Sequence, residues 1–316
     1  MQTPRRLVIS GMFVVAAAIV AAPLLAQELA LKYTWPKGEE LRYTFTTEST
    51  VAMSGLPGVG DMTVGNTIVQ VHQMTGDSVA ADGVATVRMR IEAIKMTSST
   101  PMGSVNYDSA APATATDSTA AMLASVYGPM IGANLTATMA PNGVVRTLEG
   151  MAKLKETAQA VQQATAGLGL GGADLLSDEA MKSTYRNFGS LPDKPVKPGD
   201  TWKSEVTIPN PLGAQTVSST FTAKGVEKLD GRDVVRIGVV EVIKTAPGGT
   251  MGPMSVQVGD GTSQGDVLFN AKLGRLERCT IDTAIPMSMN LPSPDGSTIS
   301  IQASSKAKTT VQLVVK

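Results

Sequence analysis

Apolar and polar side chains alternate along most of the chain. In residues 41–46 and 202–208, nearly every second side chain is apolar and those between are polar. The same alternation runs through 84–96 and 234–244. Successive side chains of a β-strand point to opposite faces, so this period predicts strands with one buried and one solvated face. The predicted fold class is therefore mainly β and antiparallel, with a few helices.

Glycine-containing turns recur in the same order in the two halves of the chain. The corresponding positions are Gly38 and Gly199, Gly83 and Gly231, and Gly143 and Gly274. Asp-Gly and Asn-Gly between alternating runs are strong hairpin signals, because glycine adopts positive φ without a steric penalty. This order predicts an internal duplication, with a first β half over 27–147 and a second over 190–316. Each half is expected to form a similar curved antiparallel sheet or half-barrel.

Between the halves the hydrophobic period changes to about 3.6 residues, which predicts a helical connector over 148–189. Leu148, Met151, Leu154 and Val161 fall on one face of its first helix. Short helices are marginal alone in water, so this stripe needs a partner surface. The connector is expected to pack across the concave side of one sheet, either as permanent core or as a lid over a ligand.

The first 26 residues have the composition of a signal peptide. Arg5 and Arg6 precede an apolar run over 7–22, and 23–26 is a small-residue cleavage segment. Export to the periplasm or the extracellular space is therefore predicted, with no membrane span after the leader is cleaved. An uncleaved anchor is the alternative, because the apolar run approaches the length of a bilayer span. Gln27 stands where a lipoprotein would need cysteine.

Composition narrows the classes of function. Of the residues, 42% are hydrophobic but only 4% aromatic, so Val, Ile, Leu, Ala and Met must build the core; 15 of the 17 Met follow the leader. The 27 basic residues balance 27 acidic ones and form no basic run, so no nucleic-acid partner is expected. A single cysteine, Cys279, and a single histidine, His72, argue against a disulfide scaffold and a zinc site. Cys279 is expected in the core and His72 on a solvated strand face.

No catalytic, cofactor or metal-binding residue can be assigned. Gly261-Thr262-Ser263-Gln264-Gly265 matches the nucleophile-elbow pattern of hydrolases, but a strand follows it and no histidine lies downstream. A glycine-rich hairpin loop is the favoured interpretation of this segment. The sequence thus favours a non-catalytic binding or structural protein of the cell envelope. A hydrolase that uses carboxylates not yet identified is the alternative.

Methionine is the one compositional oddity. Met287 and Met289 occupy the same face of a predicted strand. Methionine adapts its shape to irregular apolar surfaces, and this use is favoured over a Cu(I) site. With the connector stripe, these residues predict an apolar ligand groove lined by Leu148, Met151, Leu154, Val161, Met287 and Met289. The expected partner is a lipid, another apolar small molecule or an envelope protein.

The segment from Leu191 to Trp202 contains a Pro-Val-x-x-Gly-Asp-x-Trp run. This run resembles a segment of an exported bacterial family catalogued as a domain of unknown function. The start at 38–43, the Asn142-Gly143 hairpin and 148–150 also fit the pattern. The resemblance implies an exported two-part β protein and supplies no site residues. The layout is also similar, at the level of fold only, to periplasmic lipoprotein carriers, whose curved open sheet and helices enclose an apolar groove.

Overall fold

The computed structural model describes most of the chain after residue 27. The described residues are 28–55, 58, 60–101, 103–111, 118–152, 154–156, 181–182, 184–185, 190–208, 213–246, 249–251, 254–292 and 297–315. The predicted signal peptide, 1–26, and most of the predicted connector lie outside them.

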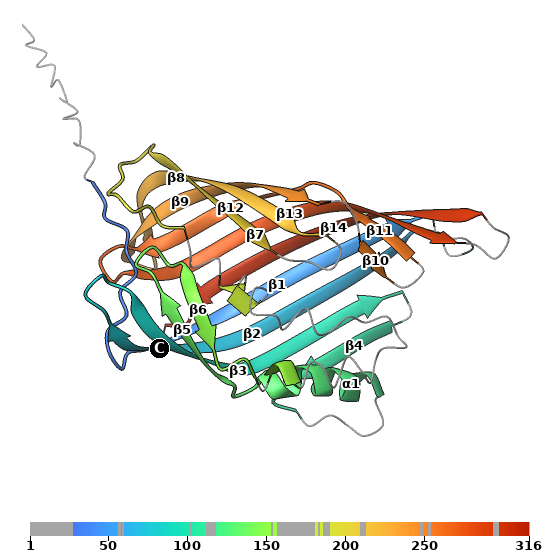
Figure 1. The fold of residues 1–316 in the computed structure, drawn as a ribbon, viewed down its shortest axis with the longest axis horizontal. Helices are drawn as coiled ribbons and strands as arrows, with labels where there is room; N and C mark the ends of the chain where they lie inside the picture. Colours follow the sequence, from blue (N-terminus) through green and yellow to red (C-terminus); the bar gives the residue numbers. More distant parts are fainter. Residues whose placement is uncertain are drawn as a thin grey trace, which may run out of the picture.

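Within these ranges the chain forms one large antiparallel sheet of fourteen strands, so the mainly β prediction is confirmed (Figure 1). The strands are β1 (Glu40–Ser54), β2 (Met62–Val79), β3 (Ala85–Thr100), β4 (Gly103–Asp108), β5 (Asn134–Met139), β6 (Val145–Glu149), β7 (Thr201–Ile208), β8 (Gln215–Leu229), β9 (Arg232–Thr245), β10 (Gly249–Met251), β11 (Met254–Val258), β12 (Gly261–Asn270), β13 (Arg275–Pro292) and β14 (Thr298–Leu313). The helix α1 (Ser118–Tyr127) and the 3-10 helix η1 (Gly128–Met130) lie between β4 and β5.

The two halves follow similar paths through the sheet. The order is β1-β2-β3-β5-β6 in the first half and β7-β8-β9-β12-β13 in the second, which then adds β14. The insertions also correspond: β4 leaves the path after β3, and the β10–β11 hairpin leaves it after β9. The glycine turns that suggested the duplication occupy matching places before β1 and β7, between β2 and β3 or β8 and β9, and between β5 and β6 or β12 and β13. All six of these glycines have positive φ.

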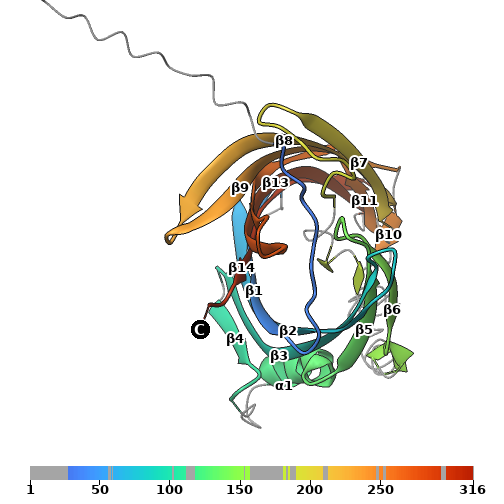
Figure 2. The same ribbon diagram turned by 90° about the vertical axis from the view of Figure 1, so that its left-hand side faces the viewer.

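The halves share one sheet instead of forming the two predicted sheets. β1 pairs with β14 from Tyr43↔Leu313 to Ser54↔Gln302, which joins the halves edge to edge. Two separate sheets would leave both of these long strands with a row of unpaired N–H and C=O groups. The joined sheet curls strongly, and its remaining path edges are β6 and β7 (Figure 2).

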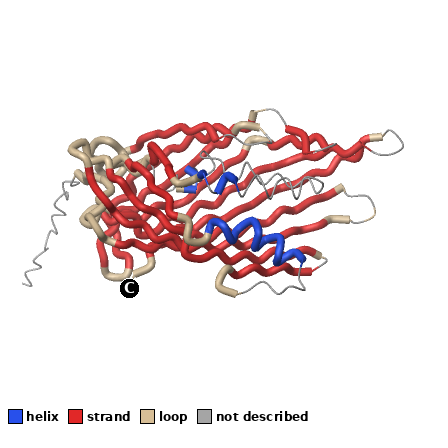
Figure 3. The backbone as a smooth tube through the Cα atoms, turned by 60° about the horizontal axis from the view of Figure 1, so that its bottom comes forward, coloured by secondary structure: helices blue, strands red, loops and turns tan. Residues whose placement is uncertain are grey.

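The curled sheet has an inner and an outer face, which alternate residue by residue. On β9, Ile237, Val239 and Ile243 are buried on the inner face, whereas Val240 and Val242 are exposed on the outer face. The α1 helix lies beside β4 (Figure 3). There Tyr127 packs against Tyr107, with ring centroids 5.7 Å apart.

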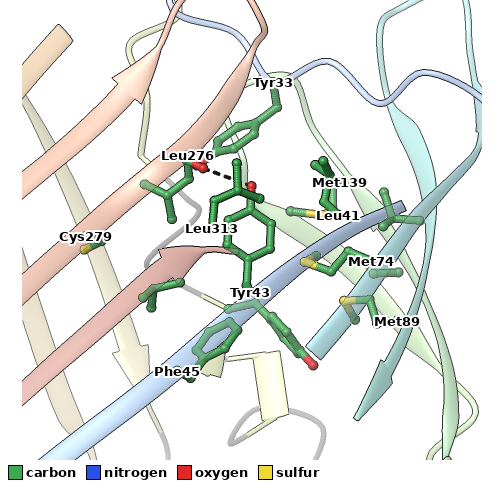
Figure 4. Packing of buried hydrophobic residues seen from close by; sticks show 14 of the residues in the cluster. Tyr33, Leu41, Tyr43, Phe45, Met74, Met89, Met139, Leu276, Cys279 and Leu313 are labelled. Atoms are coloured by element: carbon green, nitrogen blue, oxygen red, sulfur yellow. Dashed lines mark hydrogen bonds between the residues drawn. The ribbon is translucent and has the colours of Figure 1, made fainter. Parts of the chain in front are cut away.

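The densest packing lies at one end of the inner face. Tyr43 is fully buried there and donates a hydrogen bond from its hydroxyl to the Leu276 carbonyl at 3.1 Å (Figure 4). Leu313, Met74 and Phe45 surround it from three adjacent strands. Because aromatics are scarce, methionine and branched aliphatic side chains supply most of this cluster.

Residues 28–37 cross the same end of the curled sheet as a strap (Figure 2). Its alternate residues Leu31, Tyr33 and Trp35 are buried in the core. Its backbone bonds to both halves, with Tyr33 N–H donating to the Pro141 carbonyl at 2.8 Å and Thr34 N–H to the Gly274 carbonyl at 2.9 Å. The strap therefore closes this end of the sheet.

The segment that carries the family resemblance connects this closed end to β7. Leu191 N–H donates to the Asn142 carbonyl at 3.1 Å, in the turn between β5 and β6. Val196 forms a β-bridge with Leu29 of the strap, and the Trp202 indole N–H donates to the Ser190 carbonyl. The segment thus fastens the first half to the edge strand of the second.

Candidate functional site

A row of polar side chains crosses the inner face of the sheet. Ladder pairing places one residue from each of nine neighbouring strands side by side, and we call this row the polar belt. From β7 to β3 its members are Ser204, Ser219, Glu241, Ser263, Thr283, Ala307, Ser49, Asn66 and Ser98. Ala307 is the only apolar residue among the nine.

The belt is most buried around Glu241, whose exposed fraction is 6%. Its Oε1 accepts a hydrogen bond from the Ser219 hydroxyl at 2.9 Å. On the neighbouring strand Ser263 is 2% exposed, and its hydroxyl lies 3.0 Å from that of Thr283. Buried polar groups are costly unless they are hydrogen-bonded, so these partners stabilise the belt within an otherwise apolar face.

Beyond the belt, away from the strap, the inner face becomes apolar, and we call this part the distal rows. One row runs across five strands and contains Met62, Met53, Ala303, Met287 and Val258. The next contains Ile301, Met289 and Val256. The row closest to the belt contains Val64, Val51, Ser305 and Ile285, of which Ser305 is polar. Ile301, Val256 and Ala303 are buried, and the other members of the three rows are half-buried.

The structure separates the residues predicted to line one groove. Met287 and Met289 lie in the distal rows, whereas Met151 and Leu154 are buried in the core cluster near the strap end. Val161 lies outside the described residues.

Leu148 corrects the predicted start of the connector, because it belongs to strand β6, which continues to Glu149. Leu148 pairs with Ala137, which pairs with Val87, and Val87 pairs with Gly76 on β2. The row that contains Met287 crosses the same strand at Met62. At about 3.3 Å per residue these points are roughly 45 Å apart along β2.

His72 corrects another expectation, because it is buried rather than solvated. Its exposed fraction is 1%, and it points to the inner face beside Phe45. Its Nδ1 lies 3.0 Å from the Tyr185 hydroxyl and its Nε2 lies 2.9 Å from Gln70 Oε1. Burial lowers the pKa of His72 to about 4. The described end of the connector, carried by Tyr185, therefore packs on the inner face.

The segment 261–265 is a strand, not the predicted glycine-rich loop. It begins β12, and both glycines lie where a Cβ would collide with β13. Close approach of the two strands explains the glycines without a catalytic turn. The Ser263 hydroxyl lies 3.0 Å from that of Thr283, and the one histidine of the chain is bonded to Tyr185 instead.

Two carboxyl side chains are buried among the described residues, Glu241 and Glu277. Glu277 accepts from Asn270 at 3.2 Å and pairs with Arg232 at 3.1 Å, which is a compensated ion cluster. It precedes Thr283 of the polar belt by six positions on β13, about 20 Å of strand. Paired catalytic carboxyls lie about 5–10 Å apart, so these two do not form such a pair.

Other candidate chemistry is sparse in the described part of the chain. It contains no group of three or more His, Cys, Asp or Glu side chains placed to hold a metal ion. Cys279 is 1% exposed in the core, as predicted. In the same described ranges, no helix combines the length and the apolar character needed to cross a bilayer.

A groove of about 750 Å³ lies at the belt. Belt residues such as Glu241 and Ser263 line it together with outer-face side chains, both apolar ones such as Val240 and the charged Glu48, Lys308 and Asp282, which are adjacent across three strands.

The family of unknown function DUF6263 has a model that matches residues 82–276. The chain belongs to this family. The predicted membership of a family without assigned function is therefore confirmed, and no curated protein matches the sequence.

Similar solved structures share at most a general fold. Lipovitellin, in a structure titled for its lipid–protein interactions, is 9% identical with a TM-score of 0.48; the match covers 89% of this chain and 26% of lipovitellin. This chain thus spans about a quarter of that protein. DynF, from the dynemicin biosynthesis pathway of Micromonospora chersina, is 10% identical with a TM-score of 0.21, covering 95% of this chain and 92% of DynF.

Two features of the site were missed at the level of sequence. The alternation of Leu31, Tyr33 and Trp35 was a usable signal for the strap. The polar belt had no local signal, because its members are spread from Ser49 to Ala307 and meet only through strand register.

Proposed function

We propose that the protein is an exported, non-catalytic binding protein that holds an apolar molecule on the distal rows of its inner face. The observation that carries the proposal is the row of Met62, Met53, Ala303, Met287 and Val258, which is apolar across five strands and only half-buried at every member except Ala303. A row that served only as core would be fully buried, as Tyr43 and Met74 are at the strap end. Partly exposed, contiguous apolar surface is typical of binding sites.

Methionine suits such a site. Its unbranched, polarisable side chain adapts to ligands of varied shape, and three of the row's members are methionines. The strands beneath them are fixed by long ladders, so the surface is preorganised by backbone hydrogen bonds while its side chains adapt.

The test is binding of N-phenyl-1-naphthylamine, a neutral probe that fluoresces in apolar sites. The mature protein is expected to enhance its fluorescence saturably. Met287→Glu should weaken probe binding at least tenfold, because a carboxylate in the middle of an apolar row is costly to desolvate.

Gln302→Glu is the matched control, since Gln302 is exposed on the outer face of adjacent β14. It should bind the probe as the native protein does. Absence of saturable binding by the native protein, or equal loss in both variants, would refute the proposal.

Export is proposed from the leader pattern of 1–26 alone. N-terminal sequencing of the protein recovered from the cell envelope should give a first residue near Gln27. An intact Met1 in the membrane fraction would show that the leader is retained as an anchor.

A further inference from the structure

We propose that the distal rows are an oxidation site, at which hydrogen peroxide converts methionine thioethers to sulfoxides and so releases the apolar ligand. The residues are Met53, Met62, Met287 and Met289, which we call the distal methionines. This inference rests on the proposed function and adds how the same site is regulated. It follows from the place of these methionines, on a part of the inner face that is apolar and only partly buried.

Strand register brings the distal methionines into one patch. Met53 of β1 is directly opposite Met62 of β2, and Met287 of β13 continues the same row beyond Ala303. Met289 follows Met287 by two positions on the same strand face. Neighbouring strands lie about 4.8 Å apart and alternate residues about 7 Å apart, so the patch measures roughly 14 by 7 Å. A ligand that covers the row therefore contacts several thioethers at once.

Methionines at the strap end are protected from a reagent in solution. Met74, Met89 and Met139 belong to the core cluster, and their exposed fractions are 0%, 2% and 0%. The distal methionines are half-buried, so a small oxidant reaches them from solvent while the core remains closed to it. Oxidation turns an apolar side chain into a polar one. It therefore changes the binding surface and leaves intact the packing that holds the fold.

The chemical step transfers one oxygen atom to sulfur. The thioether attacks one oxygen of hydrogen peroxide, the O–O bond breaks, and the proton of the transferred oxygen passes to the departing oxygen, which leaves as water. Sulfur is oxidised by two electrons and the peroxide is reduced. The sulfoxide oxygen accepts hydrogen bonds, but the row from Met62 to Val258 contains no side-chain donor. An apolar ligand would strip water from the sulfoxides without replacing those hydrogen bonds, which weakens its binding.

Brief treatment of the mature protein with hydrogen peroxide, which catalase then removes, tests both the order of oxidation and its effect. Peptide mass spectrometry should find an added oxygen atom on the distal methionines before it appears on Met74, Met89 or Met139. The dissociation constant for N-phenyl-1-naphthylamine should rise at least tenfold, while the urea unfolding midpoint stays the same. Methionine sulfoxide reductases of both stereospecificities, added together, should restore binding of the probe, because they return the sulfoxides to thioethers.

The fourfold variant M53L/M62L/M287L/M289L assigns the effect to the distal methionines. Leucine has a similar volume and is apolar but cannot be oxidised, so this variant should bind the probe equally before and after peroxide. Met96→Leu is the matched control, because Met96 is also half-buried, on β3, but lies outside the distal rows. It should lose binding after peroxide as the native protein does.

Loss of binding by the fourfold variant after peroxide would overturn the inference and leave the proposed function intact. Unchanged binding by native protein whose distal methionines carry the added oxygen, or oxidation of the core methionines at the same rate, would also overturn it. If the untreated native protein does not bind the probe, the proposed function fails, and its regulation fails with it. If the fourfold variant does not fold, Met287→Leu alone should lose less binding after peroxide than the native protein, and an equal loss would overturn the inference.

Discussion

The burial of His72 predicts a specific loss of stability in acid. The pKa of His72 falls from 6.5 to about 4 because burial disfavours the charged imidazolium. No charged group contributes to the shift; the ring is surrounded by Phe45, Gln70 and Tyr185. In the unfolded chain the imidazole regains its ordinary pKa.

The direction of the pH effect on stability depends on whether the folded or the unfolded chain binds the proton. Between pH 6.5 and pH 4 the unfolded chain protonates His72 and the folded chain does not, so the folded state loses stability as pH falls. Above pH 6.5 the contribution of His72 is constant. The shift is about 2.5 pKa units, and each unit corresponds to 1.36 kcal/mol, so the loss over this window is about 3 kcal/mol.

The perturbation is His72→Gln, which does not titrate and can still hydrogen-bond to Tyr185. Urea unfolding of both proteins at several pH values from 7.5 to 4 gives the difference in stability. As pH falls, the free energy of unfolding of the variant should rise by about 3 kcal/mol relative to that of the native protein. Carboxyl groups titrate in both proteins and cancel in the comparison.

Tyr185→Phe is the control. It removes one hydrogen bond to His72 and should cost about 1 kcal/mol at every pH, while it leaves the pH dependence in place. Parallel stability curves for the native protein and His72→Gln from pH 7.5 to 4 would refute the assigned burial of the imidazole.

Further predictions concern the core and two kinds of ion pair. Leu154→Asp places a carboxylate in the core, where Leu154 is 2% exposed, and should destabilise the protein by about 4 kcal/mol in a denaturation assay; an unchanged midpoint would place Leu154 outside the core. Arg232→Ala removes a partner of the buried Glu277 and should cost about 3 kcal/mol. Asp266→Asn breaks a solvent-exposed pair with Arg236 and should cost less than about 1 kcal/mol, so equal losses in these two variants would contradict the difference in burial.

Local physics made much of the fold predictable from sequence. Alternating residues specify strands because side chains of a strand point to opposite faces. The Asp230-Gly231 turn was predictable because Asp-Gly tolerates the positive φ angles of a tight hairpin. Both residues adopt positive φ in the structure. The burial of Cys279 was predictable from its place in an alternating strand.

The sequence did not determine which face of a strand is buried where both faces carry usable side chains. On β2 the predicted solvated face of His72 is in fact the inner face, which His72 and Gln70 occupy. The deciding contact is Tyr185, more than a hundred positions away, which covers the imidazole and bonds to it. Burial of a polar residue depends on a partner that local pattern does not identify.

Tertiary structure alone decided the candidate site. β1 and β14 lie near opposite ends of the sequence, so no local pattern shows whether they pair with each other or remain separate edges. That pairing carries the polar belt from Thr283 through Ala307 to Ser49, and a slip of one residue in the register would turn these side chains to the outer face. The sequence determines the alternation within each strand, because that is a local property. The rows across strands exist only when the register is fixed by hydrogen bonds between distant segments.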